Sequence, residues 1–194
     1  MLTQATFEKV RRKTEVVLGK MFPETDPSAA CLLWAGVASA ILKTDRLLPD
    51  GVTAMMQAGT AHWRFCDKPA PEPLYFGYAY DPWAAFERMR AHQAFPEMHV
   101  WLALIKDGVG THILDFSAGC QEAQLHRILN AEWEAPYCLP PVLQITLDDP
   151  KYDCIYRPDP GATDLAFQVL QNHFLEQAGK PQLPLRFIMP ARTT

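Results

Sequence analysis

The chain has 194 residues, which is enough for one domain with a sizeable hydrophobic core. Hydrophobic residues make up 48% and charged residues 21%, an ordinary balance for a globular protein that excludes a disordered or fibrous chain. The formal net charge is −4 and the longest basic run is Arg11-Arg12-Lys13, so the charge pattern of a nucleic-acid-binding protein is missing. We therefore expect a single domain over residues 1–194 that does not bind nucleic acid.

Apolar stretches and cysteines bear on where the protein resides. The longest apolar stretch, residues 31–42, is too short to cross a bilayer, and the first ten residues lack the pattern of a secretory signal. The five cysteines, at positions 31, 66, 120, 138 and 154, include no CxxC pair, so neither a disulfide framework nor a zinc knuckle is predicted. We expect a cytoplasmic protein with free thiols and no membrane contact.

Two helices are predicted in the first 45 residues. Apolar residues scattered among charged ones indicate a surface amphipathic helix over roughly the first twenty residues, ended by Phe22-Pro23. The segment Asp26-Pro27-Ser28 then offers a helix start, with Asp26 or Ser28 as N-cap, for a helix over residues 29–42. This second helix is apolar nearly all round and rich in small residues, so we expect it to be the buried central helix, packed on a sheet.

Strand and helix patterns alternate after the turn Pro49-Asp50-Gly51. Aromatic and β-branched residues indicate strands, and the last two predicted strands should form an antiparallel hairpin around Asp107-Gly108. The predicted elements are strands over residues 52–65 and 74–80, a helix over 83–93, and strands over 99–105 and 111–116.

Prolines divide the remainder of the chain. We expect a helix over residues 121–129, loops with at most one short strand over 136–160, a closing helix over 163–176 and a candidate strand over 185–189. Together these elements predict an α+β fold in which a central buried helix packs on an antiparallel sheet.

Cys31 is the first residue that suggests chemistry. A thiolate is the reactive form of cysteine, and the unpaired N–H groups at a helix N-terminus favour it. With Ser28 as the cap, Cys31 lies in the first turn of its helix. With Asp26 as the cap, Cys31 lies in the second turn, where the effect of the helix is weaker.

A thiol nucleophile needs a base, and His99 stands at the start of an apolar predicted strand. In a hairpin that turns around Asp107-Gly108 we expect His99 directly opposite Asp115. A carboxylate at one ring nitrogen fixes the imidazole tautomer and stabilises the imidazolium. The sequence therefore predicts Cys31 as nucleophile, His99 as base and Asp115 as the residue that orients His99.

These residues resemble the papain-like and transglutaminase-like superfamily over about residues 25–120. The shared features are Cys31 on a small-residue helix, His99-Val-Trp101 on one strand and Ile113-Leu-Asp115-Phe-Ser on the next. An Asp sixteen residues after His-x-Trp is most similar to transglutaminase-core and arylamine N-acetyltransferase proteins, whose triads run Cys, His, Asp. The resemblance implies a papain-like fold and acyl transfer from a small-molecule or peptide substrate through a Cys31 thioester. It implies neither a metal nor an organic cofactor.

The sequence departs from papain-type peptidases around the cysteine. Those enzymes carry a Gln shortly before the nucleophile and a Trp directly after it, whereas residues 22–30 contain no Gln and Leu32 follows Cys31, with Trp34 two residues further on. The backbone N–H of Cys31 is one candidate oxyanion donor, and a second donor is not identified. An alternative function is therefore a catalytically inactive binding module with the same fold.

Other titratable residues are weaker candidates. His62 and His112 lie in predicted strands, where a partly buried histidine bonded to the backbone is the ordinary case, and His62 is kept as a reserve base. Cys120 and His126 are six residues apart on a predicted helix and do not share a face, so no metal site is predicted there. A cluster of aromatic residues after the first strand could line an acyl pocket, although alternating aromatics more often pack a core. The cluster comprises Tyr75, Phe76, Tyr78, Tyr80 and Trp83.

Overall fold

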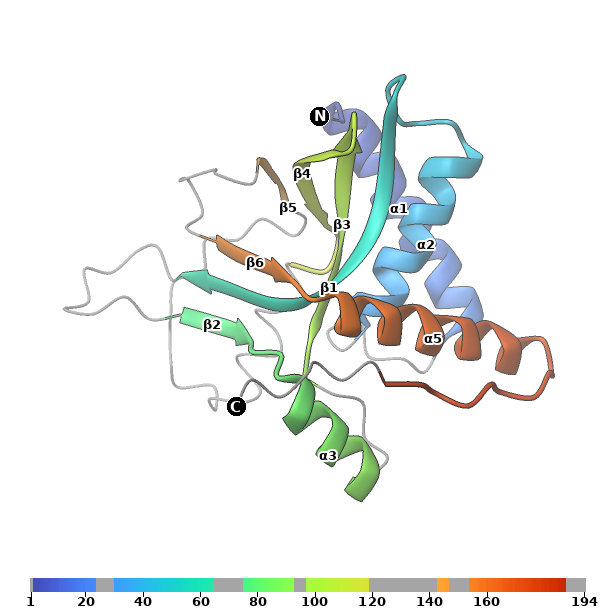
Figure 1. The fold of residues 1–194 in the computed structure, drawn as a ribbon. Helices are drawn as coiled ribbons and strands as arrows, with labels where there is room; N and C mark the ends of the chain where they lie inside the picture. The colour runs from blue at the N-terminus through green and yellow to red at the C-terminus, as the bar shows by residue number, and fades with distance from the viewer. Residues whose placement is uncertain are drawn as a thin grey trace, which may run out of the picture.

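The computed structural model describes residues 2–23, 30–64, 75–92, 97–118, 143–146 and 154–187. Within these ranges the chain forms helices and one antiparallel sheet, so the predicted α+β class is confirmed (Figure 1). The helices are α1 (Gln4–Met21), α2 (Cys31–Thr44), α3 (Pro82–His92) and α5 (Pro160–Gln177). The strands are β1 (Val52–Arg64), β2 (Tyr75–Tyr78), β3 (His99–Lys106), β4 (Val109–Asp115), β5 (Leu143–Thr146) and β6 (Cys154–Pro158).

The sheet is organised around the long strand β1. Its strand order is β2-β1-β3-β4-β5, and β6 also pairs with β1. Residues 52–59 of β1 pair with β3, whereas its second half pairs with β2 and β6. Figure 1 shows β1 curving through the molecule to connect these two parts of the sheet.

Gly59 lies where the two parts of the sheet meet. It pairs with His99 on β3 and with Pro158 on β6. Its φ is 156°, and a Cβ atom added there would lie 2.3 Å from the carbonyl oxygen of Arg157. Only glycine fits this close approach of the two backbones. The start of β3, and with it His99, is therefore held against β1 and next to β6.

Helices α1, α2 and α5 cover one face of the sheet (Figure 1). The α2 helix contacts α1, α5, β1 and β3, and most of its side chains are buried. This confirms the prediction of a central buried helix, because a helix without a polar face must be covered on all sides. Its Gly36 permits a close approach to Leu170 of α5.

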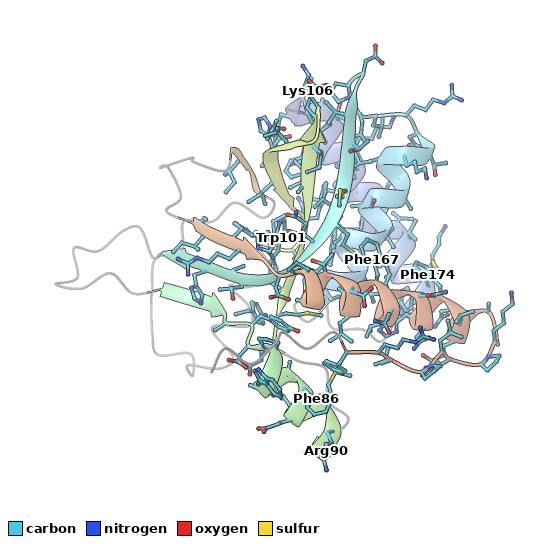
Figure 2. The ribbon with its side chains drawn as sticks, in the orientation of Figure 1. Phe86, Arg90, Trp101, Lys106, Phe167 and Phe174 are labelled. Carbon is cyan, nitrogen blue, oxygen red and sulfur yellow. The ribbon has the colours of Figure 1, made fainter. Side chains whose placement is uncertain are left out.

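Strand β3 is buried on both faces. Val100, Leu102 and Leu104 belong to the core beneath the helices. The alternate residue Trp101 packs in a second cluster, with Ala61, Ile113, Ala118 and Ile145. Successive side chains of a strand point to opposite faces, so His99 shares the face of Trp101. Figure 2 shows Trp101 where β1, β3 and β6 come together.

The start of α2 differs from the predicted one. The helix begins at Cys31 and its N-cap is Ala30, which makes no side-chain capping hydrogen bond. Neither Asp26 nor Ser28 is therefore the N-cap, and both lie outside the described residues. The two predicted caps were good cap types, but the helix begins later, with Ala30 as its N-cap and Cys31 as its first residue.

The C-terminal third also corrects the prediction. Two strands, β5 and β6, replace the single short strand expected over residues 136–160. Prolines flank both strands, and only Pro158 lies within one of them, as its last residue. Of the candidate strand over residues 185–189, residues 185–187 form no strand, since the side chain of Gln168 on α5 binds the backbone of Arg186, and residues 188–189 lie outside the described residues. The helix predicted over residues 121–129 lies outside the described residues. No helix in the described ranges is long and apolar enough to cross a membrane.

Candidate active site

His99 and Asp115 meet across the β3–β4 hairpin, but not as directly opposed residues. The hairpin turns at Asp107 and Gly108, both with positive φ, as its Asp-Gly sequence predicts. Leu102 pairs with Leu114, so the same register continued by one pair places Asp115 opposite Trp101. The predicted direct opposition of His99 and Asp115 is therefore wrong. They are diagonal neighbours on one face, a separation that long side chains can bridge.

An irregularity in β4 produces this diagonal arrangement. Ile105 pairs with Gly110, whereas Leu104 pairs with His112, so Thr111 is an extra residue in β4. The Thr111 hydroxyl donates a 3.2 Å hydrogen bond to the carbonyl oxygen of Leu104. Without this extra residue the register would place position 115 opposite Val100, on the face covered by helices. The bulge thus accounts for the shared face of Asp115 and His99.

The Asp115 carboxylate is surrounded by hydrogen-bond donors. Its Oδ2 lies 2.6 Å from Nε2 of His99 and accepts a 2.8 Å hydrogen bond from the Tyr156 hydroxyl. Its Oδ1 accepts hydrogen bonds of 2.9 Å from both the backbone N–H and the hydroxyl of Ser117. His99 and Asp115 are each 0% exposed. This is a buried, charge-assisted hydrogen-bond network.

Cys31 lies next to His99 as the first residue of α2. The first backbone hydrogen bond of the helix joins the N–H of Trp34 to Ala30, so the N–H of Cys31 precedes the bonded turns. Cys31 lies close enough to His99 to contribute to raising the pKa of the imidazole, and Cys31 is 9% exposed. The structure therefore brings together all three residues that the sequence predicted.

The charges within this group stabilise one another. Burial alone lowers the pKa of His99, but the charge and hydrogen bond of Asp115, together with the Cys31 thiol, raise the pKa to about 10. Burial alone raises the pKa of Asp115, but His99, the Tyr156 hydroxyl and the Ser117 N–H outweigh burial, and this pKa lies below its ordinary value. At neutral pH an imidazolium therefore faces a carboxylate.

Aromatic rings enclose the imidazole. Tyr78 of β2 stacks on His99 with a centroid distance of 5.5 Å and an interplanar angle of 14°. Trp101 lies 6.2 Å from His99 at 19°, and Tyr156 lies 6.3 Å from it at 50°. Tyr78 belongs to the aromatic cluster noted in the sequence, and it is in contact with the site. These rings exclude water from the His99–Asp115 hydrogen bond and so strengthen it.

Sequence reasoning missed Tyr156 as a member of the site. Tyr156 lies in a proline-rich region for which at most one short strand was predicted. The alternating segment Cys154-Ile-Tyr-Arg was a signal for a strand, but no sequence pattern connects that strand with Asp115. Only the pairing of β6 with β1 brings Tyr156 to Asp115, 41 residues away along the chain.

The weaker candidates stay apart from this site. His62 neighbours Ala61, which packs with Trp101, so alternation along β1 turns His62 to the other face. His112 points to the helix-covered side, and burial lowers its pKa. Cys120 and His126 lie outside the described residues. In the part of the chain that the structure describes, no cluster of three or more His, Cys, Asp or Glu residues could hold a metal ion.

The chain was compared with protein-family models, curated proteins and solved structures. No family model matches it, and no curated protein or solved structure matches it significantly.

Proposed function

We propose that this protein is a cysteine-dependent acyl hydrolase or acyltransferase that works through a thioester on Cys31. The observation that carries this proposal is the position of the buried His99, which lies 2.6 Å from Asp115 and close enough to Cys31 for the thiol to help raise the pKa of the imidazole. A nucleophile beside a base that is held by a third group is the arrangement that activated thiols require. The substrate would be a small molecule or peptide with a reactive acyl group, such as an amide, ester or thioester.

The chemistry follows from the two nitrogens of His99. Nε2 is held by Asp115, which leaves Nδ1 to exchange a proton with the thiol. In the reactive pair the thiol proton already lies on His99, and in the first half-reaction the thiolate sulfur bonds to the carbonyl carbon. The bond from that carbon to the leaving group then breaks, and the leaving group takes the proton from His99. In the second half-reaction His99 accepts a proton from water or an amine, which attacks the thioester and releases Cys31.

Two further features support acyl transfer. The raised pKa of His99 favours an imidazolium next to a thiolate, the reactive form of such a pair. The N–H of Cys31 precedes the first bonded turn of α2, so it is a candidate donor to the oxyanion. A helix that begins with cysteine and packs on an antiparallel sheet with His and Asp on adjacent strands also fits the papain-like fold that we propose for the chain.

A catalytically inactive binding module is the second candidate function. Its support is the burial of the site, since Cys31 is 9% exposed and His99 is 0% exposed. A thioester mechanism requires a substrate carbonyl to reach the sulfur, whereas a binding module needs no access to it. The two candidates therefore differ in the reactivity of Cys31 in the folded protein.

The deciding experiment is the rate of iodoacetamide alkylation of each cysteine as a function of pH, read by mass spectrometry. The native chain is compared with His99→Gln, and Cys154 on β6 is the internal reference. We expect Cys31 to stay reactive well below the pH at which an ordinary thiol ionises, and to lose this reactivity in His99→Gln. A Cys31 that is inert, or indifferent to His99 in a folded chain, would favour the binding module.

Covalent turnover is tested with an activated ester. Incubation with p-nitrophenyl acetate should place an acetyl group on Cys31, detected in the peptide that contains residue 31 and absent in Cys31→Ser. Release of the acetyl group by water marks a hydrolase, whereas release only after an amine is added marks an acyltransferase.

A further inference from the structure

Tyr156 reaches the active site from a strand that pairs with neither β3 nor β4. β6 pairs with the second half of β1, and from there the Tyr156 hydroxyl donates to Oδ2 of Asp115 at 2.8 Å. The same oxygen faces Nε2 of His99 at 2.6 Å. The ring of Tyr156 also packs edge-on against Trp101 at 5.1 Å. Tyr156 thus binds Asp115, which would orient His99, and its ring lies 6.3 Å from the imidazole of His99, which would carry the proton.

The four donors around Asp115 are not equivalent. A carboxylate offers about four acceptor positions, and His99, Tyr156 and the two donors of Ser117 fill them. Ser117 is two residues from Asp115 and holds Oδ1 locally. Tyr156 is the donor from another strand, and it binds the oxygen that also faces His99. Its hydrogen bond therefore fixes the position of Oδ2 relative to His99.

We propose that Tyr156 is a positioning residue that keeps Asp115 ionised and aimed at His99, and that it thereby sets how far into acid the Cys31 thiolate survives. This inference rests on the proposed function, because it concerns the reactive state of the same thiol. It adds the lowest pH at which the Cys31 thiolate persists, which Cys31, His99 and Asp115 alone do not specify.

The physical reason is the cost of a buried charge. Burial favours the protonated form of Asp115, and each donated hydrogen bond favours the anion. Loss of the Tyr156 hydroxyl removes one of the two hydrogen bonds to Oδ2 and leaves the one from His99, so Asp115 takes up a proton at a higher pH. His99 then loses its anionic partner, the imidazolium becomes less stable, and Cys31 regains its proton.

The test compares native protein, Tyr156→Phe and Tyr80→Phe in the full chain. Tyr80→Phe is the matched control, because it removes a hydroxyl from another half-buried tyrosine outside the triad. The readout is the pH at which Cys31 has lost half of its maximal alkylation rate by iodoacetamide. We expect Tyr156→Phe to raise this pH by about one unit, the size of one hydrogen bond to a charged group, and Tyr80→Phe to leave it unchanged.

A second measurement does not depend on access to the thiol. The imidazole of His99, labelled with ¹⁵N, should change its NMR signal at the same acid midpoint, and Tyr156→Phe should move this midpoint in the same direction. Near-UV circular dichroism establishes that each variant is folded.

Each outcome bears on one claim. A folded Tyr156→Phe with native acid midpoints overturns the positioning role, while His99-dependent reactivity of native Cys31 leaves the proposed function standing. A Tyr156→Phe chain that does not fold also overturns that role, in favour of a structural one. A native Cys31 without any His99-dependent reactivity overturns the proposed function, and the inference falls with it.

Discussion

His99 and Asp115 are diagonal neighbours across a β-hairpin, joined by a 2.6 Å contact between Nε2 and Oδ2. Asp115 lies opposite Trp101 when the observed register is continued by one pair, so the carboxylate reaches back along the strand toward the imidazole. Ser117 and Tyr156 hold the carboxylate in this position. The stability of the His99–Asp115 pair therefore depends on the charge of the carboxylate and on Ser117 and Tyr156, which orient the carboxylate.

The Asp115→Asn variant tests this dependence. The amide keeps the shape of the side chain but removes the negative charge, so the imidazolium of His99 loses its partner. We expect the rate of acetyl transfer to Cys31 to fall by about 100-fold or more, and the protein to lose roughly 3 kcal/mol of unfolding free energy. Acetylation by mass spectrometry and urea denaturation measure the two effects.

Asp107→Asn is the matched control for that variant. It makes the same chemical change in the turn of the same hairpin, where the backbone has a φ of 53° that asparagine also tolerates. This variant should acetylate at the native rate. Equal losses in the two variants would show that the effect of Asp115→Asn is not specific to the buried pair.

The pairing of His99 with Asp115 shows where sequence reasoning succeeds and where it ends. Alternation and the Asp-Gly turn were enough to predict the hairpin, because these signals are local. The bulge at Thr111 was not predicted, since a residue that leaves the ladder has no signature in one sequence. The predicted partners were nevertheless brought together, because the bulge preserves the face on which Asp115 lies.

Long-range contacts account for the rest of what was missed. The apolar, small-residue pattern of α2 was enough to predict a buried helix, but its first residue depends on the fold around Ala30. Tyr156 enters the site only because β6 pairs with the second half of β1, a contact across about 100 residues. Local patterns therefore predicted most of the described elements and the proximity of Cys31, His99 and Asp115, whereas the place of Tyr156 beside Asp115 follows from the sheet topology.

The pH dependence of stability should report the buried pair. The pKa of His99 is raised from 6.5 to about 10 in the folded chain, so folding favours its protonated form. The stabilisation is fully present below about pH 6.5 and is lost as the pH rises through about 10. We expect the difference in unfolding free energy between native protein and His99→Gln to shrink over this window, by up to about 1.4 kcal/mol per pH unit.

Urea denaturation at several pH values from about 6 to about 10 measures this difference. Asp115 changes the unfolding free energy with pH in the opposite direction to His99, because folding lowers the pKa of Asp115. Its contribution is present above the ordinary pKa of 3.8 and is lost as the pH falls below that value. A constant difference between native protein and His99→Gln across the alkaline window would contradict a charged His99 at neutral pH.

Gly59→Ala tests the junction that holds His99 beside β6. A methyl group at this position would lie 2.3 Å from the carbonyl oxygen of Arg157, and the φ of 156° disfavours any residue except glycine. We expect a loss of about 2 kcal/mol or more in unfolding free energy, together with loss of the low-pH reactivity of Cys31. Urea denaturation and the alkylation profile measure both.

Gly19→Ala supplies the control for Gly59→Ala. Gly19 lies in α1, and a Cβ atom there would meet no heavy atom within 4 Å. Alanine is the better helix former, so this variant should gain up to about 1 kcal/mol and keep native reactivity at Cys31. Similar destabilisation of both variants would contradict a special role for the junction at Gly59.

The segment after α5 offers a prediction independent of the active site. Asn172 donates to the carbonyl oxygen of Leu183 and accepts from its N–H, both at 2.8 Å. Gln168, one turn earlier on α5, binds Arg186 in the same two-point way, at 2.9 Å and 2.7 Å. Two amide side chains one turn apart thus hold the backbone of an extended segment, and Phe187 then packs edge-on against Phe86 of α3.

Asn172→Ala should release this segment locally, because both hydrogen bonds to Leu183 disappear while the helix gains a good helix former. We expect amide hydrogen exchange at Leu183 to accelerate by about tenfold, with a smaller change at Arg186. Gln168→Ala is the reciprocal control and should accelerate Arg186 more than Leu183. Equal acceleration at both amides in both variants would mean that the segment detaches as one unit, and that the two side chains do not hold separate points.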